Sequence, residues 1–151
     1  MKDLYRFIEE FGGSFADLLP EVPAAVIGRV EMNGVPGVAK LVIGEAHNFP
    51  ELARVWRKEV LVPMFGAITK RIRMAQKAGE VTEGPPELFA MLIASPMILT
   101  LLFREAFGAE FAPSKILAGL ANLHGQILVR GMLLGEQSSA LSPNTRTSRK
   151  K

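Results

Sequence analysis

The chain has 151 residues, of which 48% are hydrophobic, and this size and composition fit one domain with a packed core. It has no cysteine, which excludes disulfides, a thiolate nucleophile and a cysteine-based zinc site and favours a reducing compartment. Four of the 18 basic residues lie in residues 137–151, so residues 1–136 carry 14 basic against 15 acidic residues. A near-neutral body does not indicate a nucleic-acid surface, despite the formal net charge of +3.

The two ends of the chain lack the features of a targeting segment. Lys2 and Asp3 follow Met1, where a secretion signal would be basic and then apolar, so we expect a cytoplasmic protein. Residues 137–151 are polar apart from Leu141 and cannot bury enough apolar area to offset the entropy of ordering. We therefore predict one domain over residues 1–136 and a disordered basic tail over residues 137–151.

The first third of the chain predicts short helices. From Asp3 to Leu19 the apolar residues recur at helical steps, and Gly12 and Gly13 weaken the middle of this segment. Residues 24–32 read as a second helix that ends at the Asn-Gly pair at 33–34, and residues 36–48 read as a third.

The clearest predicted helix runs from Pro50 to Lys77. Proline stands in its first turn and Gly79 just beyond its last, and Pro63 should kink its axis because proline has no amide hydrogen. Its basic side chains, spread around the helix among glutamates, indicate a solvated face rather than a nucleic-acid groove. An apolar stripe predicts that one face is core: Leu52, Val55, Trp56, Val60, Met64, Ala67, Ile68, Ile72 and Ala75.

The segment from Leu88 to Phe103 has sixteen residues without a charge, fewer than the 18 or so expected of a membrane span, and Pro96 interrupts it. A helix that is apolar almost all round must be covered on both sides, so we expect a partner subunit to cover one side. A last helix, from Pro113 to about Leu134, combines an apolar stripe with small residues that allow close helix packing. An ordinary internal hairpin is the alternative. No strand-like alternation occurs, so the predicted fold is all-α.

Few residues could carry chemistry. His47 and His124 are the only histidines, and neither has a metal-binding spacing around it, so we predict no metal site. There is no phosphate-binding loop and no nucleophile with a partner base, so we predict no enzymatic activity and no cofactor. His124 interrupts an apolar helix, where an imidazole can hydrogen-bond a ligand or pack as a core or interface histidine.

Three ordered motifs carry a resemblance to a known family. They are the run from Val42 to Trp56, the pair Val62-Pro63, and Ala78-Gly79-Glu80. Together they resemble the C-terminal domain of tetracycline-repressor-like (TetR/AcrR) transcriptional regulators, over roughly residues 4–136. Lys2-Asp3-Leu4 is similar to the segment that follows the recognition helix of such regulators. The resemblance therefore implies a helix-turn-helix upstream of this chain and DNA contact only through it, so that the chain is a fragment or a headless form.

The resemblance also implies two sites. The last two long helices, Glu87–Phe107 and Ser114–Leu134, would pair with the same helices of a second subunit as a four-helix bundle, and an apolar cavity beside them would hold a small apolar effector. The predicted dimer interface is Leu88, Leu92, Leu99, Phe103, Ile116, Leu120, Leu123, Ile127 and Leu134. The predicted effector-binding residues are Phe11, Trp56, Val60, Met64, Phe89, Ile93, Met97 and His124.

Two other functions compete with this interpretation. The first is a small helical carrier of apolar molecules with no role in transcription. The second is an enzyme on a helical scaffold, which lacks an acid/base or nucleophile set in the sequence. For each predicted effector-binding residue, plain core packing is the alternative.

Overall fold

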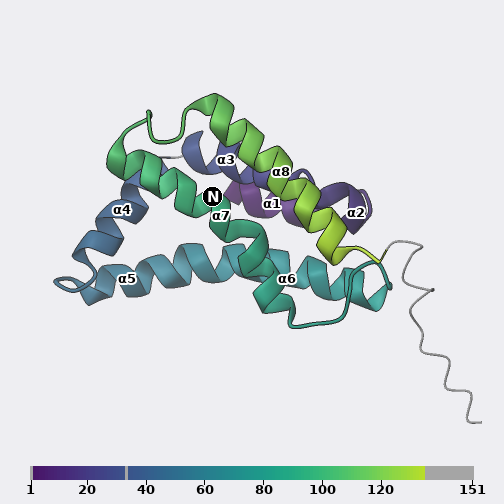
Figure 1. The fold of residues 1–151 in the computed structure, drawn as a ribbon. Coiled ribbons are helices and arrows are strands. Elements are labelled where there is room, and N and C mark those ends of the chain that lie inside the picture. The colour runs from purple at the N-terminus through teal and green to yellow at the C-terminus, as the bar shows by residue number, and fades with distance from the viewer. Residues whose placement is uncertain (1, 33, 135–151) are drawn as a thin grey trace, which may run out of the picture.

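The computed structural model describes residues 2–32 and 34–134, and its regular elements over these residues are helices (Figure 1). This confirms the predicted all-α class. Val81 and Leu133 form an isolated antiparallel bridge, in which the segment after α6 meets the end of α8. The tail predicted over residues 137–151 lies outside the described residues. The helices are α1 Lys2–Glu10, α2 Phe15–Leu18, α3 Val22–Met32, α4 Val35–Glu45, α5 Pro50–Trp56, the π-helix η1 Arg57–Leu61, α6 Val62–Lys77, α7 Pro86–Phe107 and α8 Ser114–Met132.

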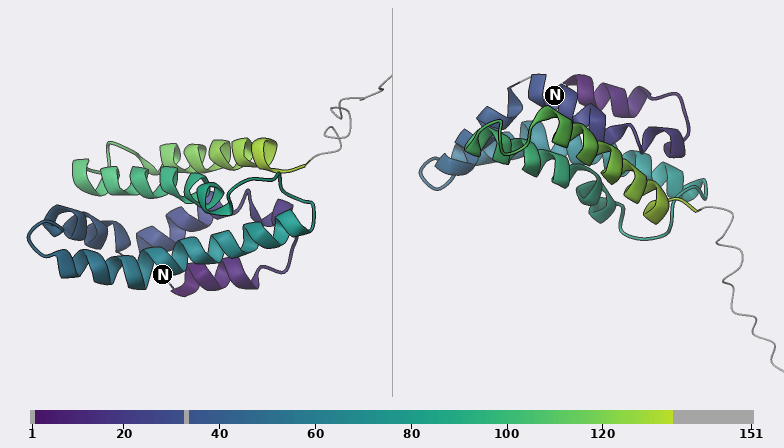
Figure 2. Two further views of the ribbon diagram at one scale, coloured as in Figure 1. Left: turned by 90° about the horizontal axis from the view of Figure 1, so that it is seen from below. Right: turned by 45° about the horizontal axis from the view of Figure 1, so that its top comes forward.

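The helices form two sides around α3. In the left view of Figure 2, α7 and α8 lie together along one side, and α1 and the long α5–α6 helix lie along the other. Helix α3 contacts α1, α4, α7 and α8, while α7 crosses α6 and also contacts α4. The core lies where these helices meet, and it leaves the far sides of α7 and α8 uncovered by the rest of the chain.

The predicted opening helix is two helices in the structure, which corrects that expectation. Helix α1 ends at Glu10, and α2 begins after a break at residues 11–14. Glycine is a poor helix former, and Ser14 starts a new helix as its N-cap. The Ser14 Oγ accepts a hydrogen bond from the Asp17 amide at 3.2 Å, and the Asp17 carboxylate accepts one from the Ser14 amide at 3.1 Å. This capping box fixes the direction of α2.

The long predicted helix is continuous, but its middle is π-helical. Pro63 offers no amide hydrogen to the carbonyl four residues earlier, and the chain widens just before it, where the Val62 amide donates to the Arg57 carbonyl. Neither α5 nor η1 carries a buried residue, and the buried stripe begins at Met64. The prediction that the stripe is core from Leu52 onward was therefore wrong for Leu52 and Val55, which are exposed.

Helix α7 is longer than its uncharged segment. It has 22 residues, because it extends beyond the uncharged segment at both ends and includes Glu87, Arg104 and Glu105. By length and composition alone, such a helix could cross a membrane. The expectation that it is too short was wrong. A single helix of this kind is weak evidence for a span, since core helices pass the same test. One face of α7 packs against α3, α4 and α6.

Candidate functional site

Helix α7 has two apolar faces with different surroundings. The inner face is buried, with every side chain at most 2% exposed: Ala90, Ile93, Ala94, Met97 and Leu101. The opposite side of the helix carries large side chains that remain open to solvent, although they are as apolar as the buried ones. The chain itself therefore covers only one side of α7.

We call the uncovered apolar surface of α7 and α8 the outer face. Its members are between 37% and 59% exposed: Leu88, Leu92, Leu99, Phe103, Ile116, Leu123, Ile127 and Leu134. These are eight of the nine residues predicted to form the dimer interface; the ninth, Leu120, is half-buried against the core. A single soluble chain rarely exposes a continuous apolar surface of this kind without a partner or ligand for it.

An aromatic cluster continues the exposed apolar surface beyond the end of α7. The rings of Phe103, Phe107 and Phe111 contact one another, with centroids 5.5–6.0 Å apart. Gly108, at φ 99°, turns the chain back between the second and third of these rings. Phe107 and Phe111 were not among the predicted interface residues: Phe107 lies one turn after Phe103 at the end of α7, and only the turn at Gly108 brings Phe111 near.

Of the predicted effector-binding residues, Phe11 borders one of the hollows described for residues 2–32 and 34–134, and the other seven border none of those hollows. Met64, Ile93 and Met97 are buried, and none of them borders the grooves described below. Trp56, Val60 and Phe89 are half-buried. Phe11 packs edge-on against Phe7 and borders a shallow hollow beside Arg29.

His124 has a structural partner. Its Nε2 lies 3.2 Å from the Ile93 carbonyl oxygen. Because a carbonyl oxygen can only accept a hydrogen bond, Nε2 is the donor in this contact. The bond joins α8 to α7 one turn before Pro96, where the helix lacks an amide donor. Of the predicted effector-binding residues, the structure thus joins His124 and Ile93 directly.

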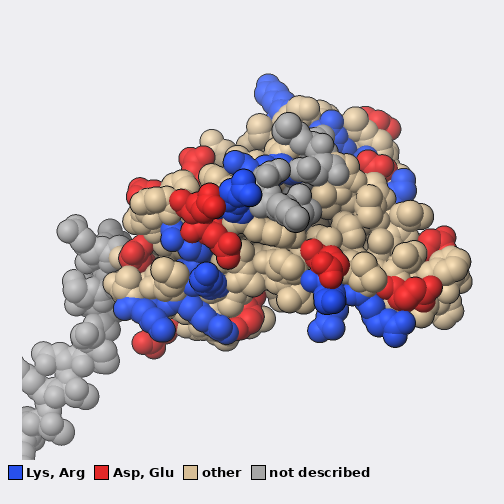
Figure 3. Space-filling view, turned by 180° about the vertical axis from the view of Figure 1, so that it is seen from behind, with Lys and Arg blue, Asp and Glu red and all other residues tan. Residues whose placement is uncertain are grey.

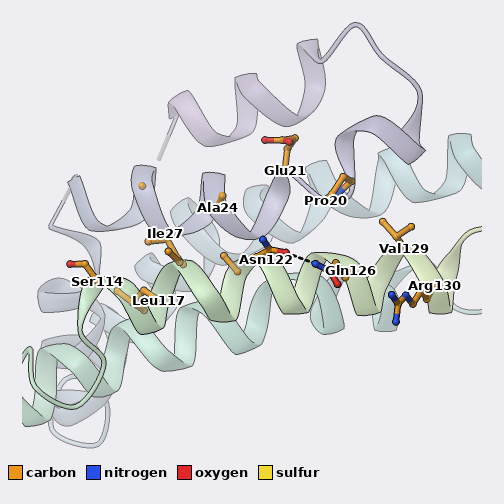
Figure 4. Close-up of a pocket in the computed structure, with 13 residues that line it drawn as sticks. Pro20, Glu21, Ala24, Ile27, Ser114, Leu117, Asn122, Gln126, Val129 and Arg130 are labelled. Atoms are coloured by element: carbon orange, nitrogen blue, oxygen red, sulfur yellow. Dashed lines mark hydrogen bonds between the residues drawn. The ribbon is translucent and has the colours of Figure 1, made fainter.

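The largest groove described lies elsewhere, between α3 and α8, with a volume of about 700 Å³ (Figure 4). It includes none of the predicted effector-binding residues. We call it the α3–α8 groove, and its lining is Pro20, Glu21, Ala24, Ile27, Gly28, Ser114, Leu117, Ala118, Ala121, Asn122, Gln126, Val129 and Arg130. The small residues of the last helix were the one signal for this groove in the sequence, and they were interpreted as sites of close helix packing.

Charged side chains of both signs are mixed on the side of the molecule that faces away from the viewer in Figure 1. In Figure 3, lysines and arginines lie interspersed with acidic residues rather than in one field. Lys70 of α6 pairs with Glu9 of α1 at 3.9 Å, and Arg73 pairs with Glu87 at the start of α7. Such exposed pairs add little to stability, but they balance the cations of the long helix. Among the described residues, no three histidines or acidic side chains gather as metal ligands do.

A hydrogen bond from α1 reaches the π-helix. The Tyr5 hydroxyl donates to the Val60 carbonyl at 3.0 Å and so provides a donor to a carbonyl of the π-helical stretch. Partial burial raises the pKa of Tyr5 above its usual value near 10. The bond links the first helix of the chain to the irregular part of the long helix.

Comparison with protein families identifies the class. Residues 18–116 match the family model described as the AefR-like transcriptional repressor C-terminal domain, from the last residue of α2 to the first turn of α8. Since the match covers about two thirds of the chain, the protein belongs to this family of TetR-type C-terminal domains. Comparisons with curated proteins and with solved structures gave no match.

Proposed function

We propose that residues 1–136 form the effector-sensing and dimerisation domain of a TetR-like transcriptional regulator, and that its effector is a small, largely apolar molecule. Family membership supports the regulatory role. The observation that carries the dimer is the outer face, which leaves seven large apolar side chains exposed on α7 and α8 and an eighth, Leu134, exposed just after α8. Pairing with the same face of a second copy would bury them all.

In this proposal the two-helix faces meet as a four-helix bundle, with Leu99 and Phe103 of α7 and Leu123 and Ile127 of α8 near its middle. Helices that pack in such bundles use apolar side chains at steps of three and four, as both helices do here. The aromatic cluster of Phe103, Phe107 and Phe111 would extend the contact at one end. Homodimerisation removes the apolar surface from water without any further partner.

We further propose that the domain has no catalytic role and acts in the cytoplasm. DNA contact would come from a helix-turn-helix outside the described helices, either in the same polypeptide or in a full-length partner. Effector binding would then act by changing how two such domains are held relative to each other.

Light scattering coupled to size-exclusion chromatography tests the dimer. The wild-type chain should elute with twice the mass of a 16.5 kDa chain, and Leu123→Asp should elute as a folded monomer because a carboxylate in the bundle has no partner. Val55→Asp is the matched control, since Val55 is as exposed as Leu123 but lies on α5. A wild-type protein that stays monomeric at micromolar concentration contradicts the proposal.

Native mass spectrometry tests the effector on the same sample. Retained small molecules should appear on the dimer and be removed by mild denaturation. Ligand retained by a monomeric wild-type chain would instead favour a small carrier of apolar molecules.

A further inference from the structure

We propose that the α3–α8 groove is the effector site of this chain and that it takes a drug-sized, uncharged and largely apolar molecule with a hydrogen-bonding group. The regulatory role of the bound molecule rests on the proposed function, whereas its binding to the groove does not depend on dimerisation. It replaces the cavity expected around Met64, Ile93 and Met97, whose side chains fill the core. The groove's volume of about 700 Å³ lies within the range of ligand sites, about 300–1,000 Å³.

Small side chains on both walls keep the groove open. Ala24 and Gly28 face it from α3, and Ala118 and Ala121 face it from α8. Its apolar contacts come from larger side chains that are at least half-buried, among them Leu117, Ile27 and Val129. A ligand here would therefore meet an apolar surface on entering, without first displacing a packed side chain.

One end of the groove is held by a close backbone contact. At Gly125 of α8, a side-chain carbon would lie 3.0 Å from the Pro20 carbonyl oxygen and 3.2 Å from the Pro20 Cα, so a larger residue would require the two backbones to move slightly apart. The contact fixes the two walls relative to each other at this end. The groove is thus a preformed site, which lowers the cost of binding.

The polar groups of the groove have unused hydrogen-bonding capacity. Gln126 Nε2 donates to Asn122 Oδ1 at 2.6 Å, which leaves the Asn122 amide hydrogens and Gln126 Oε1 without a partner among the described residues (Figure 4). They are one donor group and one acceptor on α8, from residues one helical turn apart. A ligand carbonyl, amide or hydroxyl matches this pair.

The charges of the groove balance. Glu21 lines it from the α3 side and Arg130 from α8, and neither side chain has an ion-pair partner among the described residues. One carboxylate and one guanidinium give no net attraction for an anion or a cation. An uncharged molecule therefore suits the groove better than a charged one of the same size.

The groove adjoins the surface that would report ligand binding. On α8, Ala118, Asn122 and Gln126 face the groove, while Ile116, Leu123 and Ile127 belong to the outer face. A molecule between α3 and α8 would press on the same helix that forms the proposed dimer interface. This arrangement supplies a direct physical connection between binding and the geometry of a dimer.

Fluorescence titration with Nile red, an uncharged planar dye with a carbonyl group, tests the site. Saturable binding of one dye per chain is expected, and Ala118→Phe and Ala24→Phe should each weaken it at least about ten-fold by filling the groove. Both alanines are exposed, so the fold should be retained, which circular dichroism would verify. Ala16→Phe is the matched control, because Ala16 is exposed on α2 and does not line the groove. Absence of saturable binding, or unchanged binding in both groove variants, overturns the proposal.

Two further measurements separate the parts of the inference. Asn122→Leu should weaken dye binding roughly three- to ten-fold through loss of one hydrogen-bonding group, and unchanged binding would contradict the role of the amide pair. The anionic dye 8-anilinonaphthalene-1-sulfonate should bind at the Nile red site at least about ten-fold more weakly than Nile red, as measured by the concentration that displaces Nile red compared with the dissociation constant of Nile red, and equal affinity would contradict the uncharged class. Light scattering of Ala118→Phe reports dimerisation independently, so failure of the site and failure of the dimer are distinguishable.

Discussion

The two faces of α7 have nearly the same chemistry and opposite surroundings. Leu101 on the inner face is 2% exposed, whereas Leu99, two residues away, is 49% exposed. Both are leucines in one helix, so their difference comes from what packs against each face and not from their own properties. The inner face is apolar because it forms the core, whereas no part of the described chain covers the outer face, which we propose pairs with a second copy.

The largest expected effect is on the inner face. Leu101→Asp places a carboxylate among apolar neighbours without a partner and should destabilise the fold by more than about 4 kcal/mol. Urea denaturation followed by circular dichroism measures this loss. A variant that unfolds near the wild-type midpoint would show that the inner face is not core.

Leu99→Asp is the matched change on the outer face. The carboxylate stays hydrated in a single chain, so the free energy of unfolding of the monomer should change by less than about 1 kcal/mol. The dimer should be lost, because pairing would bury the new charge. Light scattering and denaturation on the same sample measure both quantities. Loss of folding comparable to that of Leu101→Asp would remove the distinction between the two faces.

Gly125→Ala tests how closely the inner side of α8 packs against Pro20. The added methyl group would lie 3.0 Å from a backbone oxygen of Pro20, and this crowding should outweigh the higher helix propensity of alanine, for a net loss of about 1–2 kcal/mol. Gly66→Ala is the control, since its new carbon would meet nothing within 4 Å and should stabilise α6 by roughly 0.5–1 kcal/mol. Thermal unfolding measures both. Equal shifts of the same sign would contradict the close approach of α8 to Pro20.

Tyr5→Phe should have a small effect, because it removes one partly buried hydrogen bond. Loss of the bond from Tyr5 to the Val60 carbonyl should cost about 1 kcal/mol near neutral pH. Since burial raises the pKa of Tyr5, the folded chain holds its phenolic proton to higher pH than the unfolded chain does. The stabilisation is therefore complete below about pH 10 and is lost as pH rises through the folded-state pKa.

Denaturation of wild type and Tyr5→Phe from pH 8 to pH 11 measures this pH dependence. The difference between their free energies of unfolding should shrink above pH 10. Tyr5 is the only tyrosine, so no second phenol contributes to the difference. A difference that grows with pH would contradict the direction of the pKa shift.

The sequence by itself determined the helical class, most helix ends and the family. Apolar residues at helical steps, prolines in first turns and glycines beyond last turns are local signals, because each depends on residues only a few positions apart. The apolar surplus of α7 and α8 likewise predicted that one side of each would remain uncovered by the chain. Leu99 and Leu123, which the helical spacing and the family resemblance together placed in the predicted interface, are exposed in the chain.

The position of the α3–α8 groove, by contrast, could be found only from how the helices pack in three dimensions. The sequence could not separate Met64 and Met97, which fill the core, from residues that border a cavity, because methionine suits both places. Nor could it pair the small residues of α3 with those of α8, which are about ninety positions apart in the chain. A groove is a property of two surfaces and the distance between them, and that distance is set by long-range packing such as the contact of Gly125 with Pro20.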